Sequence, residues 1–318
     1  MASPLPPPVR DEPKPVIDPA FEPDPDFDPA SLPADPMPLH LAYQACEAIA
    51  RIHYENFPVA SRLLRRDRRQ ALAAIYSFAR LADNIADSER PTAERLRSLD
   101  LFERDFLRAV EGEPPNPILV ALGDSVERHS LPAEPFLDLI EAFRMDARDT
   151  VFATWDELLG YCRGSANTIG RLVLALHEVD DATAVRESDD VCTALQLTNF
   201  WQDLGRDLER GRLFLPLEHL AQFGVSRDGI VDPARREQVS RLIEHECRAT
   251  EELFERGRGI TRRVPYGLSV QLRATLLGGR EILRGVMRRG QRVLEDRPTV
   301  GGLARVRIAA LALAGFGG

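Results

Sequence analysis

Apolar residues recur at steps of three and four from Leu39 almost to the end of the 318-residue chain. This spacing places them on one face of an α-helix. Proline-containing breaks at 91, 114–117 and 132–135 separate the periodic stretches, and no alternating, β-type segment lies between them. The sequence therefore predicts an all-α fold, a single bundle of roughly ten helices joined by short loops.

Later helices have clear starting and ending signals. Thr154-Trp-Asp-Glu157 has the capping-box pattern, in which the threonine and the glutamate satisfy the first free N–H groups of a helix. An apolar run follows it to Leu176, and further helices are expected over about 185–208, 235–256 and 268–294.

The first 38 residues differ from the rest in composition. They contain 13 of the 24 prolines, with eight acidic and two basic residues. Such a density of proline excludes a helix or a central strand, so residues 1–38 are predicted to be a disordered Pro/Asp-rich tail. The net charge of −9 makes the chain a poor candidate for binding nucleic acid, which requires a basic surface.

The cysteines and the apolar segments indicate in which cellular compartment the protein is expected. The four cysteines are far apart and form no CxxC pair, which favours a reduced, cytoplasmic compartment. No run of 18 apolar residues exists, so no membrane span is expected. The apolar segment 308–316 could lie against the protein body or make a peripheral contact with the inner membrane.

Two pairs of aspartates carry the main functional signal. Asp83 and Asp87 are four residues apart, as are Asp203 and Asp207, so each pair leaves one face of its helix a single turn apart. Like charges at this spacing repel each other, and carboxylate oxygens suit Mg²⁺. A single pair of this kind is more often a solvated face. Two pairs among apolar neighbours predict an acidic cage around a metal–diphosphate.

Further polar groups lie in register with these acids. Arg80 precedes Asp83 by three residues, and Asn199 precedes Asp203 by four. Three guanidinium groups lie within or just after the second pair, on Arg206, Arg210 and Arg212, and could hold a diphosphate. Taken alone, Arg206 is as well explained by the dipole at a helix C-terminus.

These segments resemble the squalene/phytoene synthase family of head-to-head trans-isoprenyl diphosphate synthases. The most specific part is the segment 196–216, with Q-x-x-N-x-x-x-D-x-x-x-D before R-x-x-x-x-P. The resemblance implies one all-α isoprenoid synthase domain over 39–318, with a central cavity for an isoprenoid diphosphate substrate. It implies the following site: Mg²⁺ on Asp83, Asp87, Asp203 and Asp207, diphosphate on Arg80 and Arg212, and a reaction centre lined by Gln196 and Asn199.

Finer features resemble the hydroxysqualene synthase (HpnC-type) branch of that family. They are the segments 55–61 and 161–170 and the pair Gly278-Gly279. This branch implies ionisation of presqualene diphosphate, rearrangement, and capture of the cation by water to give hydroxysqualene, in squalene and hopanoid biosynthesis beside the other enzymes of that pathway. Tyr161 would then contact the substrate, and Phe57, Phe78 and Phe200 would line the cavity.

One segment departs from the condensing members of the family. Where squalene and phytoene synthases have a second tyrosine, this chain has Gly164, and the polar Ser165 and Asn167 follow it. The loss of bulk and the gain of polar atoms suit a water molecule held near a carbocation. Packing of small residues between helices explains the same three residues almost as well.

Two other functions remain open from the sequence. One is a condensing synthase that makes presqualene diphosphate or phytoene from two prenyl diphosphates. The other is an inactive helical partner in an isoprenoid complex, although such chains typically lose one aspartate motif and here all four aspartates remain.

Overall fold

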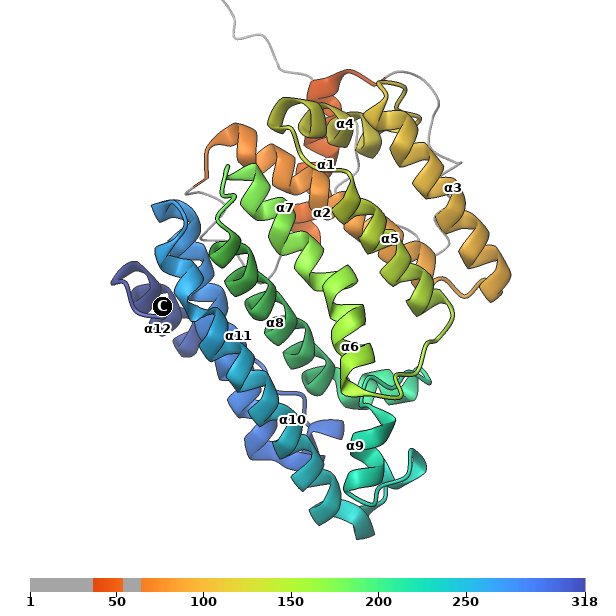
Figure 1. Cartoon of the computed structure of the whole chain (residues 1–318), viewed down its shortest axis with the longest axis vertical. Coiled ribbons are helices and arrows are strands. Elements are labelled where there is room, and N and C mark those ends of the chain that lie inside the picture. Colours follow the sequence, from red (N-terminus) through yellow and green to blue (C-terminus); the bar gives the residue numbers. More distant parts are fainter. Residues whose placement is uncertain (1–36, 54–63, 318) are drawn as a thin grey trace, which may run out of the picture.

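A computed structural model describes residues 37–53 and 64–317 as a bundle of long helices (Figure 1). Within these ranges there is no β-strand, and the predicted all-α class is confirmed. The predicted tail lies almost wholly outside the described residues, as do Phe57 and Ser61. The α-helices are α1 (Leu39–His53), α2 (Arg66–Asp87), α3 (Thr92–Val110), α4 (Pro117–His129), α5 (Glu134–Ala147), α6 (Trp155–Cys162), α7 (Thr168–Leu176), α8 (Ala182–Glu209), α9 (Leu217–Gln222), α10 (Arg236–Gly257), α11 (Tyr266–Arg289) and α12 (Gly302–Leu313).

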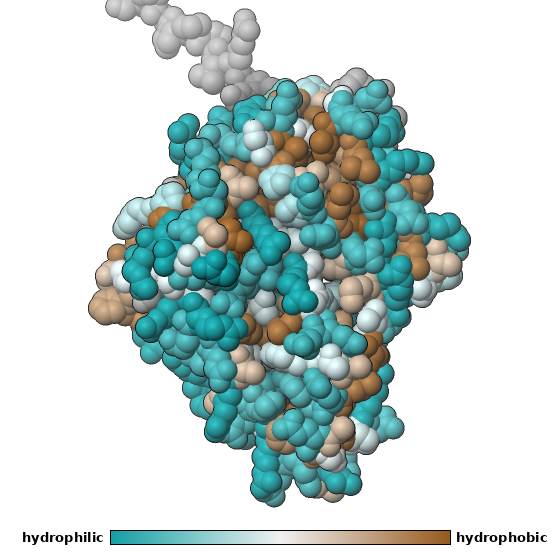
Figure 2. Space-filling model, viewed as in Figure 1, coloured by the Kyte–Doolittle hydropathy of each residue, from teal (hydrophilic) through white to brown (hydrophobic). Residues whose placement is uncertain are grey.

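The bundle has two apolar centres. One lies among α1 to α5, where the Phe78 ring packs 4.9 Å from Phe102 and 5.2 Å from Phe136, measured between ring centroids. The other lies among α6, α8, α10 and α11. Phe78 is fully buried in the first centre, so it is a core residue and not the cavity-lining ring that the family resemblance implied. Figure 2 shows mainly hydrophilic residues on the outside of the bundle, with smaller hydrophobic patches.

The predicted capping box at the start of α6 is present. Thr154 accepts a hydrogen bond from the Glu157 backbone N–H at 3.2 Å, and the Glu157 carboxylate accepts from the Thr154 N–H at 3.4 Å. The predicted apolar run to Leu176 is interrupted, because Arg163–Asn167 form a π-helical turn between α6 and α7. Such turns widen a helix by one residue and are frequent at functional sites.

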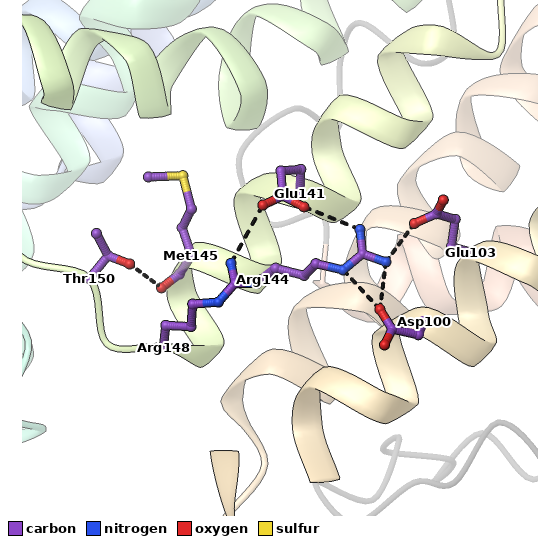
Figure 3. A network of polar contacts seen from close by, with 7 residues as sticks. All are labelled: Asp100, Glu103, Glu141, Arg144, Met145, Arg148 and Thr150. Carbon is purple, nitrogen blue, oxygen red and sulfur yellow. Dashed lines mark hydrogen bonds and ion pairs between the residues drawn. The ribbon is translucent and has the colours of Figure 1, made fainter. Parts of the chain in front are cut away.

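Helix α5 is held against α3 by one guanidinium. Arg144 is mostly buried and contacts Asp100 at 2.8 Å and Glu103 at 2.5 Å on α3, as well as Glu141 at 3.3 Å on its own helix (Figure 3). Several carboxylates on one planar cation fix the helix more firmly than a single exposed pair would. Because Arg144 faces α3, Phe143 and Asp146 lie on a different face of α5.

The segment after α11 lies directly on α8. A Cβ atom on Gly205 would come within 2.2 Å of the Leu294 carbonyl oxygen. Gln202, one turn earlier, donates a hydrogen bond to the Pro298 carbonyl at 2.7 Å. Gly205 is therefore required for close approach of the two backbones, and this approach brings Arg297 next to the aspartates of α8.

The C-terminal apolar segment forms α12, which packs on α11. Ile308 and Ala312 are buried there, while Leu303 and Val306 remain exposed. Among the described residues, no helix has the length and apolar character that crossing a membrane requires.

Replacing Gly205 with alanine tests the close approach. We expect Gly205→Ala to lower the free energy of unfolding by about 1–3 kcal/mol, because the added methyl group overpacks against backbone that cannot swing aside. The matched control is Gly278→Ala in α11, where a Cβ would meet no atom within 4 Å. That change should be neutral or stabilising, since alanine favours a helix over glycine. Thermal melting of both variants tests this expectation, and equal melting temperatures would show that the added methyl group at position 205 meets no close backbone.

Candidate active site

A cavity of about 420 Å³ opens between α2, α5, α6 and α8. Most of the residues that the sequence analysis singled out line this cavity. The lining comes from four separate helices, the π-helical turn and the segment after α8. Those that line it are Asp83, Tyr161, Ser165, Gln196, Asn199, Phe200, Asp203, Arg206, Asp207, Arg210 and Arg212, together with Phe143, Asp146 and Phe214.

Each member of the first aspartate pair contacts an arginine. Arg80 donates to Asp83 at 2.8 Å from one turn earlier on α2. Arg212 donates to Asp87 at 2.5 Å and so connects α2 with the segment that follows α8. Arg80 and Asp87 do not line the cavity themselves, but each contacts a residue that does.

The two carboxylates of the second pair differ in their contacts with arginines. Arg297 donates to both carboxylate oxygens of Asp203 through its Nε and a terminal nitrogen. Arg206 lies 3.7 Å from the same carboxylate, but its side chain is 65% exposed, so this contact is weak. Asp207 forms no ion pair with a described residue. Arg210 and Arg212 are the cations that act on its charge.

Two carboxylates of the site have raised pKa values. Burial, and then the charge of Asp87, raises the pKa of Asp83 to about 6. Burial, and then the charge of Asp203, raises the pKa of Asp207 to about 6. The ionised forms of these two carboxylates are therefore disfavoured, and a cation bound beside them would stabilise those forms.

Asp146 is a site residue that the sequence analysis missed. It accepts a hydrogen bond from the Tyr161 hydroxyl at 2.9 Å, and burial raises its pKa to about 7. Tyr161, expected to contact the substrate, does line the cavity, and burial followed by the charge of Asp146 raises its own pKa. A lone aspartate near a helix end has no spacing that distinguishes it from a solvated charge, so no sequence signal was available.

Aromatic rings close the apolar side of the cavity. Phe200 and Phe214 are stacked with ring centroids 3.9 Å apart and planes inclined by 4°. Tyr161 lies 6.1 Å from both rings. The cavity therefore has a charged wall of aspartates and arginines and an aromatic wall beside it.

The two polar residues of the π-helical turn have different environments. Ser165 lines the cavity and donates to the Tyr161 carbonyl oxygen at 3.0 Å. Asn167 is buried, and its side-chain oxygen accepts a hydrogen bond from Thr193 at 2.9 Å. Asn167 is not among the residues that line the cavity, so in this conformation its oxygen is engaged in helix packing.

The aspartate carboxylates of the site suit a magnesium ion that is bound partly by water and phosphate oxygens. Within the described ranges, no three carboxylate, histidine or cysteine side chains converge as a preformed metal centre. Mg²⁺ typically takes only one or two protein carboxylates and completes its shell with water and phosphate oxygens. Two aspartate pairs with incompletely compensated charge are suited to that mode of binding.

Comparison with known proteins gives one consistent family. The sequence profile described as squalene/phytoene synthase matches residues 50–304. A 15-cis-phytoene synthase from Synechococcus elongatus is 29% identical over 274 residues, which cover 82% of this chain and 89% of that protein. A hydroxysqualene synthase from Rhodopseudomonas palustris is 38% identical over 172 residues, which cover 54% of this chain and 58% of that protein.

Solved structures agree with this grouping. The crystal structure of squalene synthase HpnC from Alicyclobacillus acidocaldarius superposes with a TM-score of 0.74 at 38% identity, covering 81% of this chain and 97% of that one. A dehydrosqualene synthase in complex with ligand gives a TM-score of 0.76 at 26% identity, covering 87% of this chain and 96% of that one.

The raised pKa of Asp207 predicts a stability effect. A carboxyl has a pKa of about 3.9 in an unfolded chain, below the value of about 6 in the folded protein. The folded state therefore favours the protonated form, and its stability falls as pH rises from about 4 to about 6. In metal-free buffer at pH 7.5, we expect Asp207→Asn to melt above the wild type by about 2 °C, because 1 kcal/mol gives about 2–4 °C in domains of about 150–250 residues and less in a longer chain.

The gain should disappear at about pH 3, below the pKa of the carboxyl in both states, where the wild-type carboxyl is protonated whether the chain is folded or unfolded. Asp190→Asn on the same helix is the control, because Asp190 forms an ion pair with Arg256 at 3.0 Å and should give no such gain. An Asp207→Asn protein that melts below the wild type at pH 7.5 would show that the carboxylate is not under electrostatic strain.

Proposed function

The chain belongs to the squalene/phytoene synthase family, and we propose that it is the member that converts presqualene diphosphate to hydroxysqualene and diphosphate with Mg²⁺. The observation that carries this choice is the π-helical turn. By the family resemblance, Gly164 of this turn stands where condensing members have a tyrosine, and Ser165 of the same turn lines the cavity. The 38% identity to a hydroxysqualene synthase and to an HpnC structure supports the same branch.

The charged wall would bind the diphosphate end of the substrate. Asp83, Asp87, Asp203 and Asp207 would hold Mg²⁺, which when bound supplies positive charge to the leaving diphosphate oxygens. Arg206, Arg210 and Arg212 line the same wall, and their guanidinium groups can bind phosphate oxygens. These groups stabilise the charge that develops as the bond between carbon and diphosphate oxygen breaks, with the bonding electrons leaving on the diphosphate.

The aromatic wall would protect the carbocation. Phe143, Phe200 and Phe214 offer apolar and π surface where the hydrocarbon would lie. Water then forms the new carbon–oxygen bond and loses a proton. Ser165 can orient that water, and Asp146, next to Tyr161, is a carboxylate able to take the proton. Asn167 stays a proposed water-holder only if its bond to Thr193 opens.

The proposed chemistry also places the protein among other enzymes. A condensing synthase must supply presqualene diphosphate, and if squalene is the end product a two-electron reduction must replace the hydroxyl of hydroxysqualene by hydrogen, with release of water. We therefore propose that it acts in the cytoplasm in squalene and hopanoid biosynthesis, coupled to those enzymes.

Condensation of two prenyl diphosphates is the competing function. It is favoured by the phytoene synthase match, which covers more of the chain at lower identity than the hydroxysqualene synthase match does. An inactive assembly role is disfavoured, because three of the four aspartates line one cavity and the fourth pairs with Arg212 beside it.

The acidic cage is tested by removing one charge from each pair. We expect Asp83→Asn and Asp203→Asn each to lower kcat at least about 100-fold at low Mg²⁺, while the circular dichroism spectrum stays unchanged. Asp190→Asn is the control, since it changes an acid of α8 that does not line the cavity. Near wild-type turnover of either test variant would show that the cage does not hold the metal.

Product analysis distinguishes hydroxylation from condensation. With presqualene diphosphate and Mg²⁺ but no NADPH, we expect an alcohol whose hydroxyl carries the label when the reaction runs in ¹⁸O-water. Farnesyl diphosphate alone should give little or no product. Formation of presqualene diphosphate from farnesyl diphosphate at a comparable rate would contradict the proposal and favour the condensing synthase.

A further inference from the structure

Helix α12 presents apolar side chains to solvent. Leu303 is 90% exposed, Val306 70% and Leu313 52%, and Phe316 just beyond the helix is 62% exposed. The first three lie at steps of three and seven along the helix, so they share one face. We call these four residues the α12 row. The opposite side of the helix carries Ile308 and Ala312, which are buried against α11.

The α12 row is unusual for this surface. Large exposed apolar residues elsewhere, such as Leu101 on α3 and Val231, are less exposed than Leu303 and Val306, at 47% and 59%. Single exposed apolar residues need no explanation, whereas several highly exposed ones on one helix indicate a contact surface. Figure 1 places α12 at the outer edge of the bundle, and moderately hydrophobic atoms lie at that edge in Figure 2.

The charged side chains of the segment that carries the α12 row are all positive. Residues 297–318 contain three arginines and no aspartate or glutamate, in a chain whose net charge is −9. Arg305 donates from its Nε to the neutral Val300 carbonyl oxygen at 3.1 Å and forms no ion pair with a described residue. Arg307 pairs with Glu281 at 3.3 Å through a side chain that is 63% exposed, which leaves the pair open to competition by other anions.

We propose that the α12 row docks on an anionic lipid bilayer. A short helix with leucine, valine and phenylalanine on one face and arginines beside it is the pattern of an interfacial helix, which inserts its apolar side chains among lipid headgroups. Arginines near the surface add attraction to anionic lipid.

A second copy of the chain fits this face less well. Twelve residues make a helix about 18 Å long and about 10 Å wide, so the face offers roughly 200 Å². Stable protein interfaces bury about 800 Å² on each partner. A lipid surface has no such minimum, because it adapts to each inserted side chain.

The docking face is close to the active site along the chain. Arg297 bonds Asp203, and α12 begins five residues later at Gly302. Five residues of extended chain span at most about 18 Å. The face would thus hold the active site near the membrane phase. The proposal itself rests on the surface alone and does not depend on the proposed reaction.

Vesicle sedimentation of the full chain without substrate tests it. We expect binding to vesicles of equal parts phosphatidylcholine and phosphatidylglycerol, weaker binding to phosphatidylcholine alone, and weakening by 0.5 M salt. The double variant Leu303→Ser/Val306→Ser should bind anionic vesicles at least about ten-fold more weakly, because two large apolar side chains no longer insert. The control Leu101→Ser/Val231→Ser makes the same substitutions at exposed apolar residues outside the α12 row and should bind like the wild type.

Three results would overturn the proposal. The first is wild-type binding by the α12 variant, and the second is no binding of the wild type to either vesicle. The third is a wild-type dimer in light scattering that the α12 variant converts to a monomer, which would assign the face to self-association. Melting temperature and Mg²⁺-dependent diphosphate release in detergent should be unchanged in both double variants, so failure here is distinguishable from failure of the proposed function.

Discussion

The cost of partly burying two like-charged pairs of carboxylates is the constraint on which the rest of this structure depends. Asp83 and Asp87 lie one turn apart on α2, Asp203 and Asp207 lie one turn apart on α8, and burial followed by repulsion within each pair raises the pKa of Asp83 and of Asp207. Three arginines oppose this cost, two of them from parts of the chain far from the pair that they contact. Arg80 comes from α2 itself, Arg212 from the segment after α8 and Arg297 from beyond α11. The site is thus assembled from both halves of the bundle.

This compensation explains features that otherwise look unrelated. Gly205 is the residue on α8 that lets the segment 294–298 lie close enough to carry Arg297 to Asp203. Arg144 fixes α5 on α3, and α5 presents Phe143 and Asp146 to the cavity. Burial still raises the pKa of Asp83 and of Asp207, so their ionised forms remain disfavoured. A ligand that brings its own positive charge, as a metal–diphosphate does, would stabilise these ionised forms.

The sequence predicted what depends on short-range spacing. The helices, the capping box at Thr154 and the two aspartate pairs all follow from steps of three or four residues, and the structure has them within a few positions of the expected bounds. It did not predict Arg297 or Asp146. Arg297 reaches its partner across 94 residues, and only tertiary packing decides that contact. The π-helical turn was also missed, because Gly164 to Asn167 have no periodic signature.

The central claim is that the two aspartate pairs bind diphosphate through magnesium. Titration calorimetry of the full chain with inorganic diphosphate, in the presence and absence of Mg²⁺, tests it most directly and needs no knowledge of the isoprenoid. The account predicts binding with Mg²⁺, little or none without it, and loss of the Mg²⁺-dependent binding in Asp83→Asn and Asp203→Asn. Diphosphate that binds equally well without metal, on the arginines alone, would contradict it.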